Sequence, residues 1–122
     1  MDSTATNELP EGTPEYIAKR REGRETVLGL LYEAELKQVD LQKIAESRPL
    51  ALDGYAQSIL DRLTLELKRV DAEVSDISQK WELERMPAVD LSVLRIFMCE
   101  IITNPKIPAG VLVSEAVELA AK

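Results

Sequence analysis

The sequence predicts an all-α protein that folds as a compact helical bundle. Apolar residues recur at spacings of three and four along most of the chain, and no stretch alternates as a half-buried strand does. Hydrophobic residues make up 45% of the chain and are mainly aliphatic, because aromatic residues account for only 4%. A chain of 122 residues with this composition can bury one aliphatic core. We therefore expect a single helical domain.

The first helix is predicted to begin at Thr13. Residues 1–12 are acidic and polar and lack a periodic apolar face, which indicates a flexible tail. Thr13 offers an N-cap hydroxyl, and Pro14 suits the first helical position because its missing N–H group needs no partner there. We expect this helix to reach about Lys37 and to bury one face, which comprises Val27, Leu28, Leu31 and Ala34.

The middle of the chain predicts three further helical segments. Residues 38–51 carry a weak pattern that indicates a short helix. A strong apolar stripe starts near Leu52 and extends to Val70. Asp71 is expected to cap a separate helix, whose stripe is Val74, Ile77 and Trp81.

The end of the chain predicts the most apolar helix and one more. The step from Met86 to Pro87 redirects the chain, and residues 88–103 are apolar on most sides. A helix of this kind belongs at the centre of a bundle. After Pro108, a last helix is expected, with an apolar stripe that comprises Val113, Ala116, Val117 and Ala120.

The composition argues against an enzyme or a metal protein. Histidine is absent, so the commonest general base and zinc ligand are missing, and the single cysteine cannot form a paired thiolate site. We expect Cys99 to be a buried structural thiol and most carboxylates, such as Glu115 and Glu118, to be solvated. We therefore expect no catalytic residue, metal ligand or cofactor. No apolar run approaches a membrane span, and a cytoplasmic protein is expected.

A cluster of arginines near the start of the first helix is the most informative charged feature. The chain has a formal net charge of -7, yet Arg20, Arg21 and Arg24 fall within five positions. Steps of four residues back from Leu28 reach Arg24 and then Arg20, so the buried face continues as a cationic one. We expect this end of the helix to overhang the core or to meet acidic or phosphate groups, and RNA is the candidate ligand.

The acids closest in sequence to this cluster do not neutralise it fully. Glu22 and Glu25 are expected on the opposite side of the helix. Elsewhere, Tyr32 falls at the margin of the apolar face, and Asp90 falls in the first turn of the 88–103 helix. Arg95, inside that apolar helix, needs an acidic partner, for which Asp90 and Glu100 are the candidates.

Three blocks of sequence together resemble the NusB family of bacterial transcription antitermination factors. They are GRETVLGLLYEAEL at 23–36, WELERMPAVDLSVLRIFMCEI at 81–101 and IPAGVLVSEAVELAAK at 107–122. The resemblance implies an all-helical, non-enzymatic adaptor that binds the ribosomal protein NusE and, with it, boxA-type RNA in the transcription elongation complex. It also implies that Arg20, Arg21 and Arg24 contact RNA and that Tyr32 and Asp90 face NusE. A homodimer of the free protein is a further expectation.

The sequence departs from the family pattern at three places. Glu22 stands at a position that is frequently basic in the family, and Cys99 stands where the family often has a tyrosine. The chain stops at Lys122, so we expect the domain at 13–122 to lack the last helix of the family and to leave Val113 and Val117 uncovered. Two alternatives remain open: the NusB-like amino-terminal portion of a ribosomal RNA cytosine methyltransferase, and a protein-only scaffold whose arginines are paired internally.

Overall fold

The computed structural model describes residues 12–48, 52–77, 82–103 and 109–120, and every regular element in these ranges is helical. The elements are α2 (Pro14–Lys37), α3 (Leu41–Glu46), α4 (Gly54–Ile77), the short 3-10 helix η1 (Leu83–Arg85), α5 (Ala88–Thr103) and α6 (Ala109–Ala120). This confirms the predicted fold class. Residues 1–11 of the tail expected at 1–12 lie outside the described residues, as does Trp81.

Helix α2 begins and ends where the sequence predicts. The Thr13 hydroxyl accepts a hydrogen bond from the backbone N–H of Tyr16 at 3.2 Å, and Pro14 occupies the first turn. The helix ends at Gln38, whose φ of 54° is left-handed and whose backbone N–H bonds to the carbonyl of Ala34. The buried face comprises Val27, Leu30, Leu31 and Ala34, with Leu28 partly buried.

Helix α4 is one continuous helix, and the predicted break at Asp71 is wrong. The Asp53 carboxylate accepts a hydrogen bond from the backbone N–H of Ala56 at 2.9 Å and so caps the start of α4. Val70 and Val74 are both fully buried, which continues the apolar stripe through the expected break. Asp71 is tolerated inside the helix because its carboxylate pairs with Arg95 of α5.

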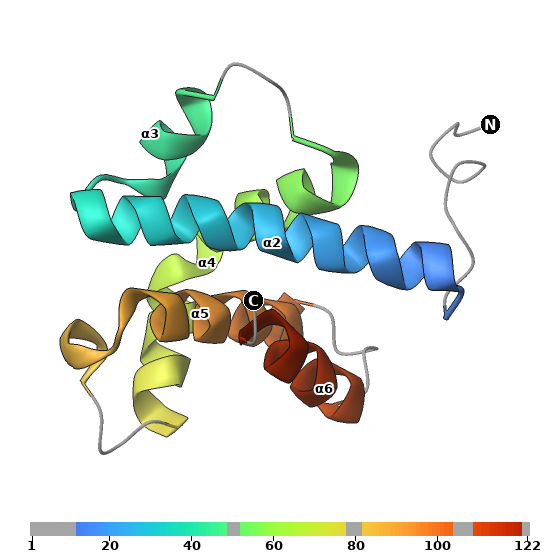
Figure 1. Ribbon diagram of the computed structural model, residues 1–122. Coiled ribbons are helices and arrows are strands. Elements are labelled where there is room, and N and C mark those ends of the chain that lie inside the picture. Colours follow the sequence, from blue (N-terminus) through green and yellow to red (C-terminus); the bar gives the residue numbers. More distant parts are fainter. Residues whose placement is uncertain (1–11, 49–51, 78–81, 104–108, 121–122) are drawn as a thin grey trace.

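Helix α5 lies at the centre of the bundle, as its apolar sequence predicts. It packs against α2, α4 and α6 (Figure 1). It runs antiparallel to α2, because Arg24 pairs with Glu100 whereas Glu35, farther along α2, pairs with Arg95. Figure 1 shows α6 beside the amino-terminal half of α2, with α3 on the other side near the end of α2. None of the helices in the described ranges has the length and apolar character of a membrane span.

The short helix α3 and the last helix α6 both form where the sequence predicts them. Helix α3 buries Leu41 and Ile44, and α6 buries Leu119. The side chains of Val113 and Val117, which we expect to be uncovered, lie outside the described part of the chain.

Candidate nucleic-acid interface

Arg24 lies inside the bundle and does not overhang the core; it meets acidic groups, the other arrangement expected for this end of the helix. It is only 5% exposed, and its Nε atom is 3.1 Å from each carboxylate oxygen of Glu100 on α5. Its Nη1 atom donates to Glu115 of α6 at 3.1 Å. Glu100 is itself only 3% exposed. Two acids from distant parts of the chain thus neutralise this buried cation.

Arg21 lies at the edge of the same cluster and remains partly open to solvent. Its Nε atom donates to both oxygens of Glu115, at 3.0 and 3.2 Å, and its Nη2 atom donates to one of them at 2.9 Å. The side chain of Arg21 is 46% exposed, whereas that of Glu115 is 11% exposed. This hydrogen bonding raises the pKa of Arg21 and lowers the pKa of Glu115. The prediction that Glu115 is a solvated surface charge is therefore wrong.

Arg20 contacts aromatic rings instead of acids. The central carbon of its guanidinium is 3.9 Å from the ring centroid of Tyr55 and 4.6 Å from that of Tyr16. Among the described residues, Arg20 has no ion pair. Its N–H groups therefore remain available to donate hydrogen bonds to a ligand, as far as the described part of the chain is concerned.

Tyr55 connects Arg20 to the buried ion pair, and sequence reasoning missed this role. Its hydroxyl donates a hydrogen bond to Glu100. Burial, aided by the negative charge of Glu100, raises the pKa of Tyr55 to about 12, so the hydroxyl keeps its proton near neutral pH. Gly23 allows the approach, because a Cβ atom there would lie 2.8 Å from the Tyr55 ring. A glycine among arginines inside a helix is the sequence signal that a neighbouring element comes close.

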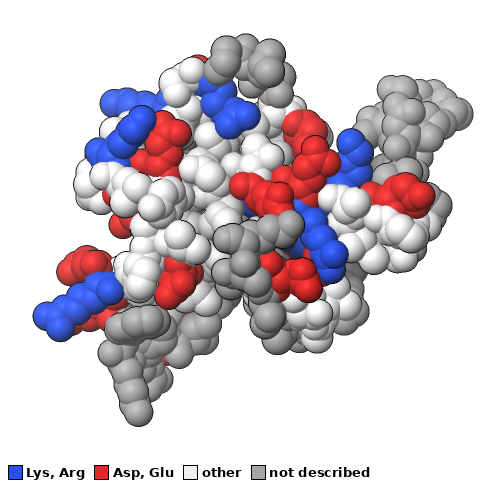
Figure 2. Space-filling model, viewed as in Figure 1, with Lys and Arg blue, Asp and Glu red and all other residues white. Residues whose placement is uncertain are grey.

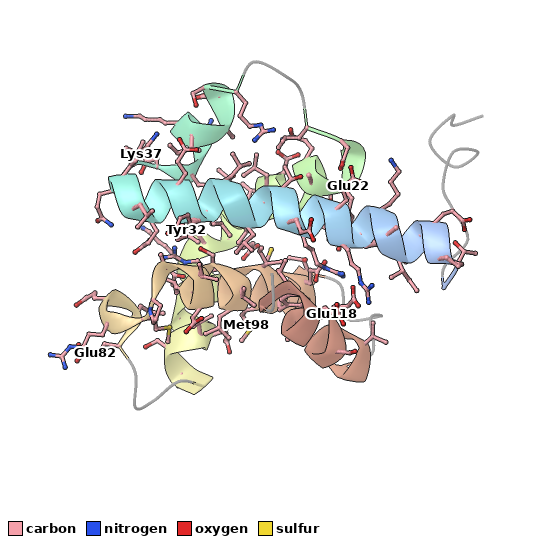
Figure 3. The ribbon with its side chains drawn as sticks, in the orientation of Figure 1. Glu22, Tyr32, Lys37, Glu82, Met98 and Glu118 are labelled. Atoms are coloured by element: carbon pink, nitrogen blue, oxygen red, sulfur yellow. The ribbon has the colours of Figure 1, made fainter. Side chains whose placement is uncertain are left out.

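The two local acids do not lie on one common side of α2. Glu22 points away from α6 in Figure 3, as predicted. Glu25, however, lines the same small hollow as Arg21, Arg24 and Glu115, so its predicted placement opposite the arginines is wrong. Figure 2 shows positive atoms bordered by negative ones where α2 passes α6. Of the three arginines, Arg21 is exposed and Arg20 is partly exposed, so these two form the arginine edge of α2 that solvent can reach.

The candidate partner residues Tyr32 and Asp90 are both exposed. Tyr32 lies on the side of α2 that faces α5 (Figure 3), and Asp90 lies in the first turn of α5. Each is within about two helical turns of the ion pair between Glu35 and Arg95, which joins their helices. The structure therefore places both at the region where α2 and α5 meet.

The predicted partners of Arg95 are wrong. Its Nε and Nη2 atoms donate to the two oxygens of Asp71 on α4, at 2.8 and 3.0 Å, and its Nη1 atom donates to Glu35 of α2 at 3.1 Å. Neither Asp90 nor Glu100 takes this role, because acids on two other helices reach the guanidinium. Arg95 thus ties three helices together.

Cys99 is a buried thiol, as predicted. It is 1% exposed, and burial raises its pKa to about 11, which opposes formation of a reactive thiolate.

Comparison with known proteins supports the resemblance noted in the sequence. A sequence model of the NusB family matches residues 21–122. The chain belongs to the NusB family. The matched range includes Arg21, Arg24, Tyr32 and Asp90, whereas Arg20 lies directly before it.

Several NusB proteins of known name are similar to this chain over most of their length. The transcription antitermination protein NusB of Desulforudis audaxviator is 37% identical over 109 residues, which cover 84% of this chain and 78% of that protein. The protein of the same name from Leifsonia xyli is 34% identical, covering 85% and 78%. That of Beutenbergia cavernae is 36% identical, covering 87% and 78%.

Proposed function

We propose that this protein is a transcription antitermination factor that binds boxA-type RNA together with NusE and supports ribosomal RNA transcription in the elongation complex. Membership of the NusB family supports this proposal, as do relatives that are named transcription antitermination proteins. The proposed role is that of a binding adaptor in the cytoplasm, with no catalytic step.

The half-exposed arginine edge of α2, made of Arg20 and Arg21, is the observation that carries the RNA-binding part. Arginine recognises phosphate with a fork of N–H donors. Arg20 has no carboxylate partner among the described residues, and Arg21 is 46% exposed beside its partner Glu115. We therefore assign direct RNA contact to Arg20 and Arg21. Arg24 is buried and contributes indirectly. It pairs with Glu115 and with Glu100, and Glu100 accepts the hydrogen bond of Tyr55.

The exposed residues Tyr32 and Asp90 support the partner-binding part. Tyrosine supplies apolar area with a polar tip, and a carboxylate suits a basic ribosomal protein. Leu36, one turn after Tyr32 on α2, and Val89, next to Asp90, are also exposed and would add apolar area to such a contact. In the free protein, the same surface is our candidate for homodimer formation, which sedimentation would detect.

A basic partner would also offset the negative net charge of this protein, which opposes RNA binding. The chain carries a net charge of -7, which repels RNA over most of its surface. A complex with NusE would add the partner's positive charge next to the narrow arginine edge. RNA binding by the pair should therefore be tighter than binding by this protein alone, and both should weaken as salt rises.

Titration of single-stranded boxA-type RNA, followed by fluorescence anisotropy with and without NusE, tests the proposal. We expect weak, salt-dependent binding by the protein alone and tighter binding by the pair. Negligible binding under both conditions at low salt would contradict the proposal. A matched RNA with a scrambled sequence separates specific binding from general attraction to phosphates.

A protein-only scaffold is the second candidate, because two of the three arginines are paired within the chain. It predicts partner binding without any RNA affinity, so the same titration decides between the two. The methyltransferase alternative gains no support from the three relatives described above, all of which are named as antitermination proteins.

A further inference from the structure

Arg20 is held differently from the other two arginines of the cluster. Arg21 and Arg24 donate to carboxylates, whereas Arg20 lies at stacking distance from the ring of Tyr55 and close to that of Tyr16. Tyr16 is one turn earlier on α2, and Tyr55 comes from α4. Two rings from different helices therefore hold one guanidinium.

Aromatic contact and hydrogen bonding use different parts of a guanidinium. A ring covers the flat face, whereas the N–H donors point outward from the edge. The rings thus limit where the Arg20 side chain can go and leave its donors available. A long side chain that is already ordered loses less conformational entropy when it binds a ligand.

Contacts that reach into the core fix the Tyr55 ring, and an N-cap bond anchors the backbone of Tyr16. Tyr55 bonds to Glu100, which holds the buried Arg24, and the lack of a Cβ atom at Gly23 lets the Tyr55 ring approach α2. The second ring belongs to Tyr16, whose backbone N–H makes the N-cap bond to Thr13. The support that Tyr55 gives to Arg20 is therefore part of the packed bundle, and Tyr16 adds the second ring from the first turn of α2.

We propose that Tyr16 and Tyr55 are positioning residues that hold the guanidinium of Arg20 as a preformed site for an RNA phosphate. This inference rests on the proposed RNA-binding function. It adds what the family assignment does not supply: a tyrosine at position 16 that sets RNA affinity without providing charge. The ligand group is a phosphate, because the donor edge of arginine matches phosphate oxygens and the aromatic rings occupy the face on which a base would stack.

A double-mutant cycle between Tyr16 and Arg20 tests the proposal. Tyr16→Leu removes the ring but leaves the backbone N-cap bond, and Tyr16→Phe keeps the ring as the matched control. We expect Y16L to weaken binding of single-stranded RNA roughly two- to fivefold, the range that corresponds to one cation–π contact at an exposed site. Y16F should bind as the wild type does. In an Arg20→Ala background, Y16L should have no further effect, because there is no guanidinium left to position.

The outcomes of the cycle separate this inference from the proposed function. If R20A weakens RNA binding but Y16L does not, the positioning role is wrong and the RNA-binding proposal stands. Equal fold losses for Y16L in both backgrounds would show a general structural effect and would also overturn the positioning role. If the wild type binds no RNA, or if R20A is without effect, the assignment of Arg20 fails and this inference fails with it.

Two measurements check the positioning without relying on Y16L affinity alone. Arg20→Lys keeps the charge but loses the planar fork, so it should weaken RNA binding at least as much as Y16L does. In the free protein, the NMR signal of the Arg20 Nε–H group should be shifted by the nearby rings. That shift should shrink in Y16L and persist in Y16F. An unshifted signal in the wild type would overturn the proposal.

Discussion

The Nε atom of Arg24 lies 3.1 Å from both carboxylate oxygens of Glu100, with both side chains buried between α2 and α5. Removing one partner leaves a buried charge without its counter-ion, which costs several kcal/mol. We predict that Arg24→Met lowers the free energy of unfolding by about 3–5 kcal/mol. The control is Lys37→Met, which removes an exposed pair with Glu33 and should cost less than about 1 kcal/mol. Urea unfolding measures both, and similar small losses would show that the buried pair adds nothing to stability.

Gly23 and Gly29 occupy the same helix but face different surroundings. A Cβ atom at Gly23 would lie 2.8 Å from the Tyr55 ring and 3.2 Å from the backbone nitrogen of Ala56, whereas one at Gly29 meets nothing within 4 Å. Gly29→Ala should stabilise the protein by about 0.5–1 kcal/mol through helix propensity. Gly23→Ala should instead destabilise it by about 1–3 kcal/mol, because α4 must move. Thermal unfolding of the two variants gives the comparison, and stabilisation by both would contradict the close approach.

Glu115 is placed to compete with RNA for Arg21. Its carboxylate accepts three hydrogen bonds from Arg21 at 2.9–3.2 Å, which are the donors that a phosphate would use. We predict that Glu115→Gln tightens RNA binding about two- to fivefold, the range that corresponds to one partly exposed ion pair. Glu118→Gln removes the same charge from an exposed position on the same helix and should have a smaller effect. Equal effects of the two variants in RNA titrations would contradict direct competition and show that Glu115 acts only through its contribution to the net charge.

The contribution of Glu115 to stability should depend on pH in a defined direction. Arg21 lowers the pKa of Glu115 in the folded state, so between this value and the ordinary value of about 4.3 the unfolded chain binds more protons. The stabilisation is therefore complete above the ordinary pKa and is lost as pH falls through the folded one. We predict that wild type exceeds Glu115→Gln in stability by a constant amount from about pH 7 to pH 5 and that the difference shrinks toward pH 3. Denaturant midpoints of the two proteins across this pH range provide the test. A stability difference that grows on acidification would contradict the prediction.

Local patterns were sufficient to predict the helices, because caps and apolar periods are properties of neighbouring residues. Thr13 and Pro14 mark the start of α2, and the bounds of α5 agree with the predicted 88–103. The helix break predicted at Asp71 is the exception, because an acid after an apolar stripe is typical of an N-cap. The actual reason for this acid is a tertiary partner, Arg95, which a single sequence does not reveal.

The candidate site was predicted only in part for the same reason. The position of the arginines on one helix face follows from helical spacing, yet the choice between phosphate and internal acids depends on which helix packs beside them. Glu100 and Glu115 are 76 and 91 residues from Arg24 in sequence, and no local rule brings them together. Tyr55 falls within the apolar stripe predicted from near Leu52 to Val70, and nothing in that pattern indicates its contacts with Arg20 and Glu100.

The measurement that tests the central claim most directly is RNA affinity after removal of the half-exposed arginine edge. We would compare Arg20→Ala/Arg21→Ala with Arg69→Ala/Arg85→Ala, which removes the same charge from exposed residues of α4 and η1. With NusE present, the first variant should bind boxA-type RNA at least tenfold more weakly than wild type and show a shallower salt dependence, since each lost phosphate contact lowers that slope. The second should remain close to wild type. Equal losses in the two variants, or none in the first, would contradict the account.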